Sequence, residues 1–326
     1  MNVITSHNEP LLRRHPANPI LTSQDWPYTI NSVFNAGATL LADGSTLLLC
    51  RVEERRGLSH LCAARSANGI DGWKVDPTPT LMPNADQYPE ELWGIEDPRL
   101  TYVPELQQYA VAYTSFSRGG PGVSLALTKD FRSFQRYGVI MSPDDKDAAL
   151  LPYRIDGLWA LIHRPMTPLG AHMWISYSPD LRHWGGHRMM LEARRGAWWD
   201  ANKIGLCSPP IETPRGWLVL YHGVRATASG SIYRLGLALF DRQQPDKCLL
   251  RGDSWIFGPE TDYERGGDVH DVVFPCGYTM GADGDTLNIY YGAADFCVAL
   301  AHGSLRCLLA WLDANGRYEQ RRDWQT

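Results

Sequence analysis

A short apolar strand that ends in polar residues recurs five times along this chain. The copies begin 62, 50, 58 and 70 residues apart, at Leu47, Tyr109, Trp159, Trp217 and Leu287. Each follows another β-rich run and a turn, and three of the turns contain Asp-Gly, a strong hairpin signal. Self-similarity at this period favours a radial array of small sheets over a two-domain sandwich. The sequence therefore predicts an all-β fold, a five-bladed β-propeller.

A second element follows three of these strands. The segments 66–73, 128–134 and 178–184 share a Ser or Thr, a turn and then an aromatic residue, and we interpret them as turns between outer strands. Residues 1–326 are interpreted as a single propeller catalytic domain. A polar N-terminal arm (1–25) and a C-terminal tail (315–326) flank it and are candidates for contacts in a homo-oligomer.

Composition argues against several classes of partner. The net charge is -5, and basic residues gather only in pairs such as Arg55-Arg56, so a nucleic-acid partner is not expected. There is no apolar signal core near the N-terminus and no apolar run of membrane-spanning length. The seven cysteines form no Cys-x-x-Cys pair, and several lie in apolar runs, which indicates free thiols, no zinc site and a cytoplasmic location.

Polar residues at the ends of the repeated strands are candidate site residues. In a propeller the innermost strands surround a central channel, and their ends contribute to a pocket there. If the repeated strands are the innermost ones, the candidates are Arg51, Glu53, Tyr113, His163, Arg164, His222 and Asp295.

Two sets of residues indicate chemistry. The segment 94–99 (GIEDPR) places Asp97 in an acidic pair at a strand start, which suits an acid; the alternative is a turn with a surface ion pair. Lys146 and Arg164 belong to the third repeat, Lys203 and His222 belong to the fourth, and Tyr233 of the fourth repeat adds a hydroxyl. Such a set of cations more often binds an anion than serves structure, because like charges repel in a partly desolvated cleft.

Over nearly its whole length the chain resembles glycoside hydrolase family 130, the β-mannoside phosphorylases and β-mannosidases. The resemblance rests on short segments in a fixed order: 31–32, 51–56, 94–99, 199–205, 221–224, 267–275 and 290–295. It implies a five-bladed propeller, no cofactor, and inorganic phosphate as co-substrate with a mannoside.

The resemblance also implies roles for individual residues. Asp97 matches the sole catalytic carboxylate, the general acid, whose proton reaches the glycosidic oxygen through the mannose 3-hydroxyl. Mannose-binding positions are matched by Asn31, Ser32, Arg51, Lys203 and Asp295, with Arg55 beside them. Phosphate-binding positions are matched by Lys146, Arg164, His222 and Tyr233. Some relatives have Arg and Asn where this chain has Lys146 and Asp147, and Asn where it has Asp271.

Phosphorolysis is the favoured reaction, since phosphate is already a nucleophile and needs cations rather than a second carboxylate as base. A hydrolase with Asp147, Asp268 or Asp271 as base, and a non-catalytic sugar-binding propeller, are the alternatives. β-1,2 and β-1,4 linkages, and mannose, glucose or N-acetylglucosamine as the acceptor, are all compatible with the sequence. Sugar stacking and core packing are alternatives for Trp93, Trp198, Trp199 and Tyr113.

Overall fold

The computed structural model describes residues 10–168, 170–228 and 230–318, whose regular secondary structure is mainly β-strand. Two sheets hold four consecutive antiparallel strands each. The first strand group is β2 (Ser32–Leu40), β3 (Thr46–Glu53), β4 (Ser59–Ser66) and β5 (Lys74–Val75). The second strand group, which follows the short 3-10 helix Pro89–Glu91, is β6 (Ile95–Val103), β7 (Gln108–Ser117), β8 (Gly120–Thr128) and β9 (Gln135–Met141).

An eleven-stranded sheet contains two more groups of this kind. The third strand group is β10 (Asp145–Leu150), β11 (Trp159–Thr167), β13 (Met173–Ser178) and β14 (Gly185–Leu191). The fourth strand group is β15 (Lys203–Leu206), β16 (Ile211–Thr213), β17 (Gly216–Thr227), β18 (Gly230–Phe240) and β19 (Cys248–Gly252). The short strand β12 (Gly170–Ala171) joins them by pairing with both β11 and β15, and β23 (Gly316–Arg317) extends the edge.

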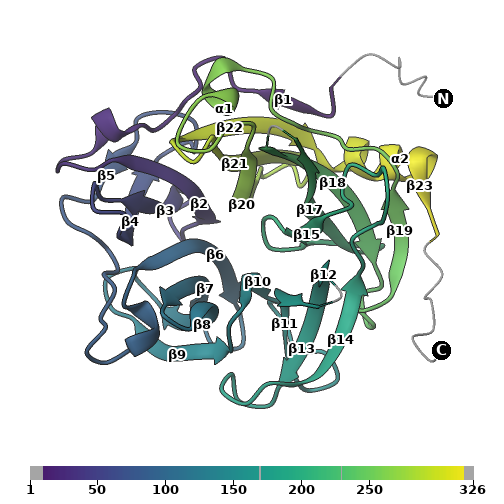
Figure 1. Ribbon diagram of the computed structural model, residues 1–326, viewed down its shortest axis with the longest axis horizontal. Helices are drawn as coiled ribbons and strands as arrows, with labels where there is room; N and C mark the ends of the chain where they lie inside the picture. Colours follow the sequence, from purple (N-terminus) through teal and green to yellow (C-terminus); the bar gives the residue numbers. More distant parts are fainter. Residues whose placement is uncertain (1–9, 169, 229, 319–326) are drawn as a thin grey trace.

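The fifth strand group joins the two ends of the chain. It consists of β20 (Val273–Met280), β21 (Thr286–Ala293), β22 (Cys297–Ser304) and, at its edge, β1 (Leu12–Arg14). Helix α1 (Asp262–Arg265) precedes this group, and α2 (Leu305–Asn315) follows it. Figure 1 shows the five groups around a common centre, with β2, β6, β10, β15 and β20 nearest to it.

All five predicted strands form, but they are not the innermost ones. They lie in β3, β7, β11, β17 and β21, the second strand of each group if β15 and β16, which both pair with β17, are counted as one, and the predicted hairpin turns precede them. The strands nearest the centre contact one another across neighbouring groups, as β2 does with β6 and β20. The prediction that the repeated strands line the centre is therefore wrong by one strand, because the inner strands lack the apolar alternation that marks the second ones.

Three of the inner strands carry the same irregularity. The ladder shifts register after Phe34 in β2, after Glu96 in β6 and after Lys146 in β10. The next residue in each case has positive φ: 46° at Asn35, 49° at Asp97 and 57° at Asp147. Asn and Asp tolerate this left-handed conformation better than most residues, and a bulge re-aims the side chain at that point. Three polar side chains are thus placed at equivalent positions.

The predicted outer turns are confirmed, and their sequence repeat has a physical cause. Ser66, Thr128 and Ser178 each accept a hydrogen bond from the backbone N–H three residues later, at 2.9–3.0 Å. Such side-chain turns favour Ser and Thr at the first position. The aromatic residue that ends each motif, such as Trp73, packs against the core.

The strand interiors account for the core. Residues such as Leu47, Val111, Leu161 and Leu218 are fully buried between neighbouring groups. Six of the seven cysteines are buried, and Cys307 is exposed. Within the described parts of the chain no helix is long and apolar enough to cross a membrane. Residues 1–9 of the predicted arm and 319–326 of the predicted tail lie outside the described residues, whereas 12–14 of the arm form β1.

Strand β1 is anchored by Arg14. Its guanidinium donates to Glu264 at 2.7 and 2.8 Å and to the Gly258 carbonyl at 2.6 Å. The carboxylate of Glu264 has no exposed surface. Burial alone would raise the pKa of Glu264, but Arg14 and backbone N–H donors hold it below its usual value. The pair thus fixes the N-terminal strand against the C-terminal part of the sequence.

We predict that Arg14→Met destabilises the protein by about 3–5 kcal/mol, the usual cost of leaving one buried partner charged. Because the pKa of Glu264 is depressed in the folded state, its contribution is present above its unfolded pKa and is lost as pH falls. Urea unfolding should therefore show a wild type–variant difference at pH 7 that shrinks towards pH 4. Arg215→Met, which breaks the exposed pair with Asp313, is the control and should cost less than about 1 kcal/mol. Equal losses for both variants would contradict the anchor.

Candidate active site

Asp97 lies at the centre of a carboxylate-rich cluster. One carboxylate oxygen, Oδ1, accepts hydrogen bonds from Asn35 Nδ2 at 2.9 Å and from Arg51 Nη1 at 3.2 Å. The residue is 5% exposed. The bulge in β6 re-aims this side chain, and the equivalent bulge in β2 places Asn35 beside it. A carboxyl group held on one oxygen keeps the other available for a proton or a substrate hydroxyl.

Arg51 gathers the remaining carboxylates. It contacts Glu53, Glu96 and Asp97, each at 3.2 Å, and its guanidinium lies 4.6 Å from the Phe34 ring centre. Burial opposes the charge, but Glu96 and Asp97 raise the pKa of Arg51 above its usual value. The guanidinium is therefore a permanent cation that holds three carboxylates from two strand groups.

Four of the six predicted mannose-binding residues lie around this cluster, whereas Lys203 lies with the second cluster described below. Asp295 follows β21 with φ 50°, and burial and then the charge of Asp97 raise its pKa to about 6. Ser32 is buried opposite Glu53, and Asn31 donates to Asp268 at 2.8 Å. The structure thus brings Asn31, Ser32, Arg51 and Asp295 together. Arg55 is exposed in the turn between β3 and β4.

A second cluster forms around Asp147. Its Oδ2 accepts from Arg164 Nε at 3.0 Å and Nη2 at 2.8 Å, and lies 3.6 Å from His222 Nε2. Burial would raise the pKa of Asp147, yet Arg164 holds it well below the usual range, so the group is a carboxylate. Burial lowers the pKa of His222 to about 3, so its imidazole is neutral at pH 7.

Partly exposed cations lie beside these buried groups. Lys146 pairs with Arg164 across β10 and β11, and the Lys203 ammonium lies 5.0 Å from the Tyr233 ring centre. Burial, and next Arg164, lower the pKa of Lys203. Tyr233 stands 5.8 Å from His222, ring centre to ring centre, and burial raises its pKa to about 12, so it keeps its hydroxyl proton. The four predicted phosphate-binding residues and Lys203 therefore converge on one place, as predicted.

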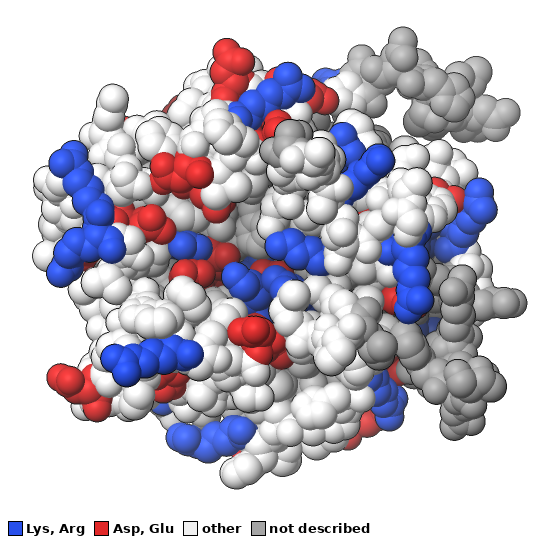
Figure 2. Space-filling view, in the orientation of Figure 1, with Lys and Arg blue, Asp and Glu red and all other residues white. Residues whose placement is uncertain are grey.

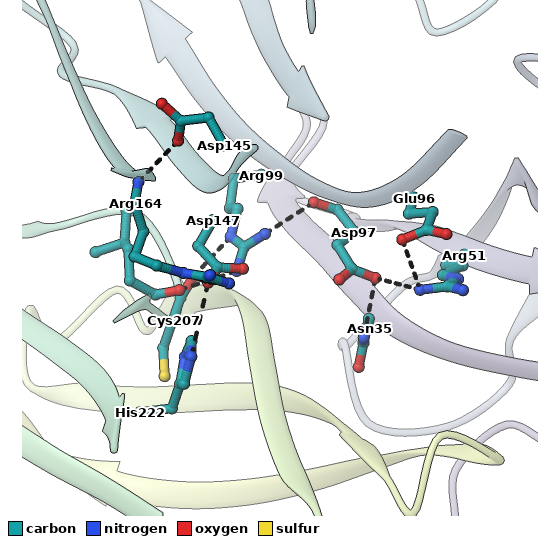
Figure 3. Close-up of polar contacts among 11 residues, drawn as sticks. Asn35, Arg51, Glu96, Asp97, Arg99, Asp145, Asp147, Arg164, Cys207 and His222 are labelled. Carbon is teal, nitrogen blue, oxygen red and sulfur yellow. Dashed lines mark hydrogen bonds and ion pairs between the residues drawn. The ribbon is translucent and has the colours of Figure 1, made fainter. Parts of the chain in front are cut away.

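Arg99 connects the two clusters (Figure 3). Its Nη1 donates to the Asp97 carbonyl at 3.0 Å, and Nη2 lies 3.5 Å from Asp147 Oδ1. The same guanidinium donates to the carbonyls of Leu206 and Cys207 at 2.9 Å each. It is 1% exposed. One side chain thus sets the position of Asp97 relative to the Asp147 cluster.

Figure 2 shows the molecule in the orientation of Figure 1. Acidic and basic side chains lie together near the middle of this face, and uncharged residues surround them. Exposed apolar side chains such as Trp93, Trp198 and Phe296 precede or follow site segments. Trp199 and Tyr113 are buried, so core packing is the right interpretation for those two. Among the residues that the structure describes, no group of three or more His, Cys, Asp or Glu side chains is placed to hold a metal ion.

Two candidates from the strand-end argument are not in the site. Tyr113 packs in the core and donates to Glu91 at 2.8 Å. His163 is buried between Asp145 (2.6 Å) and Ser176 (2.7 Å). Both predictions are wrong because successive side chains of a strand point to opposite faces of the sheet. His163 therefore points into the core, whereas Arg164, the next residue, faces the site.

Asn35, Glu96 and Arg99 contribute to the site but were not assigned a role from the sequence. Glu96 and Arg99 flank Asp97 in the 94–99 segment, and Asn35 lies four residues after Asn31. The available signal was the shared bulge: a polar residue followed by a small residue or Pro (Asn35-Ala36, Asp97-Pro98, Asp147-Ala148) in the strand before each apolar repeat.

Fold and site together define a mainly β protein in which the buried carboxylate of Asp97 lies near a cluster of basic side chains around Asp147. The family model described as beta-1,4-mannooligosaccharide phosphorylase matches residues 6–314. A Ruminococcus albus beta-1,4-mannooligosaccharide phosphorylase is 33% identical over 297 residues, 88% of this chain and 87% of the relative. This chain belongs to glycoside hydrolase family 130, as its sequence predicts.

Solved structures agree. The beta-1,2-mannobiose phosphorylase from Listeria innocua, in complex with beta-1,2-mannobiose, superposes with a TM-score of 0.83 at 30% identity, covering 93% of this chain and 99% of that one. A second structure, with a TM-score of 0.79 at 25% identity and covering 92% and 96%, comes from work describing glycoside hydrolases within the family that target beta-1,2 mannosidic linkages in Candida mannan. The family thus contains both reaction types.

Gly205 offers a test of the Asp147 cluster. A Cβ at this position would lie 2.4 Å from Asp147 Oδ2 and 2.5 Å from His222 Cε1. We predict that Gly205→Ala separates these groups, costs about 1–3 kcal/mol of stability and weakens phosphate binding. Calorimetric titration with phosphate and urea unfolding provide the measurements. Gly185→Ala, where a Cβ meets nothing within 4 Å, is the control. Unchanged phosphate affinity in a folded Gly205→Ala protein would contradict this role of the cluster.

Proposed function

We propose that this protein is an inverting β-mannoside phosphorylase that converts a β-mannoside and inorganic phosphate into α-mannose 1-phosphate and a free acceptor. The observation that carries the proposal is the convergence of Lys146, Arg164, Lys203 and Tyr233 beside Asp97. Cations and hydroxyl donors of this kind suit a phosphate oxyanion. Relatives named as phosphorylases of β-1,4- and β-1,2-linked mannosides support it.

The reaction follows from the two clusters. Mannose lies between them, held by Asn31, Ser32, Arg51 and Asp295. A phosphate oxygen attacks the anomeric carbon from the face opposite the acceptor, and the glycosidic C–O bond breaks. Asp97 supplies the proton that the departing oxygen takes, by way of the mannose 3-hydroxyl. General acid catalysis of this kind contributes about 10²–10⁴-fold in rate.

The cations do more than attract phosphate. Arg164 is fixed by Asp147 before substrate arrives, so little reorganisation is needed when charge develops on the attacking oxygen. His222 is neutral, and its buried Nδ1 has no hydrogen-bond partner among the described residues. A neutral imidazole can donate one hydrogen bond to an anion without adding a charge that the buried site would have to stabilise.

We further propose that the fold is a five-bladed β-propeller, one blade for each strand group. Four-stranded antiparallel sheets around a common centre support it, and β1 would complete the fifth blade beside β22. The cytoplasmic location stays a prediction, as does homo-oligomerisation through the arm and tail.

Hydrolysis is the second candidate, because a carboxylate lies next to the proposed sugar site: Asp268 is exposed and accepts from Asn31. Asp271 lines a cleft together with Arg234 and Trp255. Asp147 is a poor choice of base, since Arg164 holds its pKa low and occupies one of its oxygens. The family includes hydrolases of beta-1,2 mannosidic linkages.

Turnover with and without phosphate separates the two reactions. We predict that mannobioses are cleaved only when phosphate is present and that α-mannose 1-phosphate accumulates. Asp97→Asn, which keeps the shape and the bond from Asn35, should lower kcat by about 10²–10⁴-fold while the melting temperature and mannose affinity change little. Free mannose released equally fast in phosphate-free buffer would favour the hydrolase, and full activity of Asp97→Asn would remove its assignment as the acid.

Lys146 provides a test specific to phosphate. We predict that Lys146→Ala raises the apparent KM for phosphate by about 10–100-fold, the equivalent of one charged hydrogen bond, with a much smaller change in the KM for the mannoside. The matched control is Lys129→Ala, at an exposed turn between β8 and β9. A parallel rise in both KM values would place Lys146 in general substrate binding instead.

A further inference from the structure

Met166 lies on the guanidinium of Arg164. Its sulfur accepts a hydrogen bond from Arg164 Nη1 at 3.1 Å, while Nε and Nη2 of the same guanidinium are bound to Asp147. Within the described residues, the thioether is therefore the hydrogen-bond partner of the edge of Arg164 that Asp147 leaves open. A thioether is a weak acceptor, so an oxyanion would displace it readily.

Strand geometry places Met166 beside the other phosphate-binding groups. Arg164 and Met166 are two residues apart on β11, so their side chains leave the same face of the strand. Met166 pairs with Ala171 of β12, and Ala171 pairs in turn with Lys203 of β15. Met166 thus lies in the series of paired strands, β11, β12 and β15, that connects Arg164 to Lys203.

The side chain is also open to solvent. Met166 is 51% exposed, although Arg164 and Asp147 beneath it are almost completely buried. An exposed methionine reacts with peroxides, which turns a soft apolar side chain into a polar one. This exposed methionine therefore lies in direct contact with Nη1 of Arg164, a donor that phosphate would use.

We propose that Met166 is an oxidation site that controls access of phosphate to Arg164, an inference that rests on the proposed phosphorylase function. Hydrogen peroxide transfers one oxygen atom to the sulfur, which is oxidised by two electrons, while the peroxide O–O bond breaks and water leaves. The new sulfoxide oxygen is a strong acceptor and stays on Arg164 Nη1. Phosphate then competes with a group that is covalently held in place.

The test compares wild type, Met166→Leu and Met82→Leu before and after mild hydrogen peroxide treatment. Met82 is the matched control, since it is 45% exposed and is not part of either cluster. Peptide mass spectrometry reports which methionines gain oxygen. Initial rates at varied phosphate and at varied mannoside, and calorimetric titration with phosphate, report the effect.

We expect oxidised wild type and oxidised Met82→Leu to show an apparent KM and Kd for phosphate raised about tenfold, as loss of one charge-assisted hydrogen bond implies, with the KM for mannoside nearly unchanged. Methionine sulfoxide reductase should restore both values. Met166→Leu should give the same phosphate dependence before and after peroxide.

The inference is overturned if Met166 gains oxygen without a change in phosphate Kd, if Met166→Leu responds as wild type does, or if Met166 stays unoxidised while Met82 reacts. Failure of the phosphorylase proposal looks different: turnover of the untreated enzyme would then be independent of phosphate. The calorimetric titration still measures the effect of oxidation on phosphate binding in that case.

Discussion

The buried guanidinium of Arg99 is the contact on which the site depends. It bonds to its own strand at the Asp97 carbonyl, to Asp147 in the third strand group and to two carbonyls in the fourth. It also lies 5.5 Å from the ring centre of Phe274 in the fifth. A buried charge is costly unless it is paired and hydrogen-bonded, and Arg99 is paired with Asp147 and makes four hydrogen bonds. Because four groups share it, the acid and the anion-binding cluster keep a fixed separation.

Near this contact, the same β-bulge with a left-handed residue occurs in three inner strands and places three side chains with different roles. Asn35, Asp97 and Asp147 occupy the same bulged, left-handed position in successive inner strands. Asn35 donates to the acid, Asp97 is proposed as the acid, and Asp147 holds the cation that would meet phosphate. The repeat supplies the geometry, and the side chain at each copy supplies the chemistry.

Sequence reasoning was strongest where a local pattern sets the structure. The apolar second strands, their Asp-Gly turns and the Ser/Thr turns could all be predicted, since each depends on residues close in sequence. The preceding strands were expected as β-rich runs but were not recognised as the innermost ones, because some are short or bulged: β15 has four residues, and β10 reads Asp-Lys-Asp before its apolar half. Convergence of Lys146, Arg164 and His222 was foreseen from the repeat and the family resemblance. The burial of Tyr113 and His163 was not, since it depends on which side of a strand meets the next group.

The buried charges of the site are paired before any substrate binds, but they do not cancel. Arg51 offsets part of the charge of Glu53, Glu96 and Asp97, and Asp147 pairs with Arg164, whereas Lys146 and Lys203 are left partly exposed. This arrangement leaves net positive charge at one side of the proposed mannose position and net negative charge at the other. A nucleophilic anion and a proton donor require those two environments.

A crystal structure with phosphate and mannose bound is the most direct test of this account. We expect one phosphate ion within hydrogen-bond distance of Lys146, Arg164 and Tyr233, and a mannose ring between that ion and the Asp97 carboxylate. Two results would contradict the account: a phosphate ion bound elsewhere with no contact to Arg164, or a mannose ring bound away from Asp97.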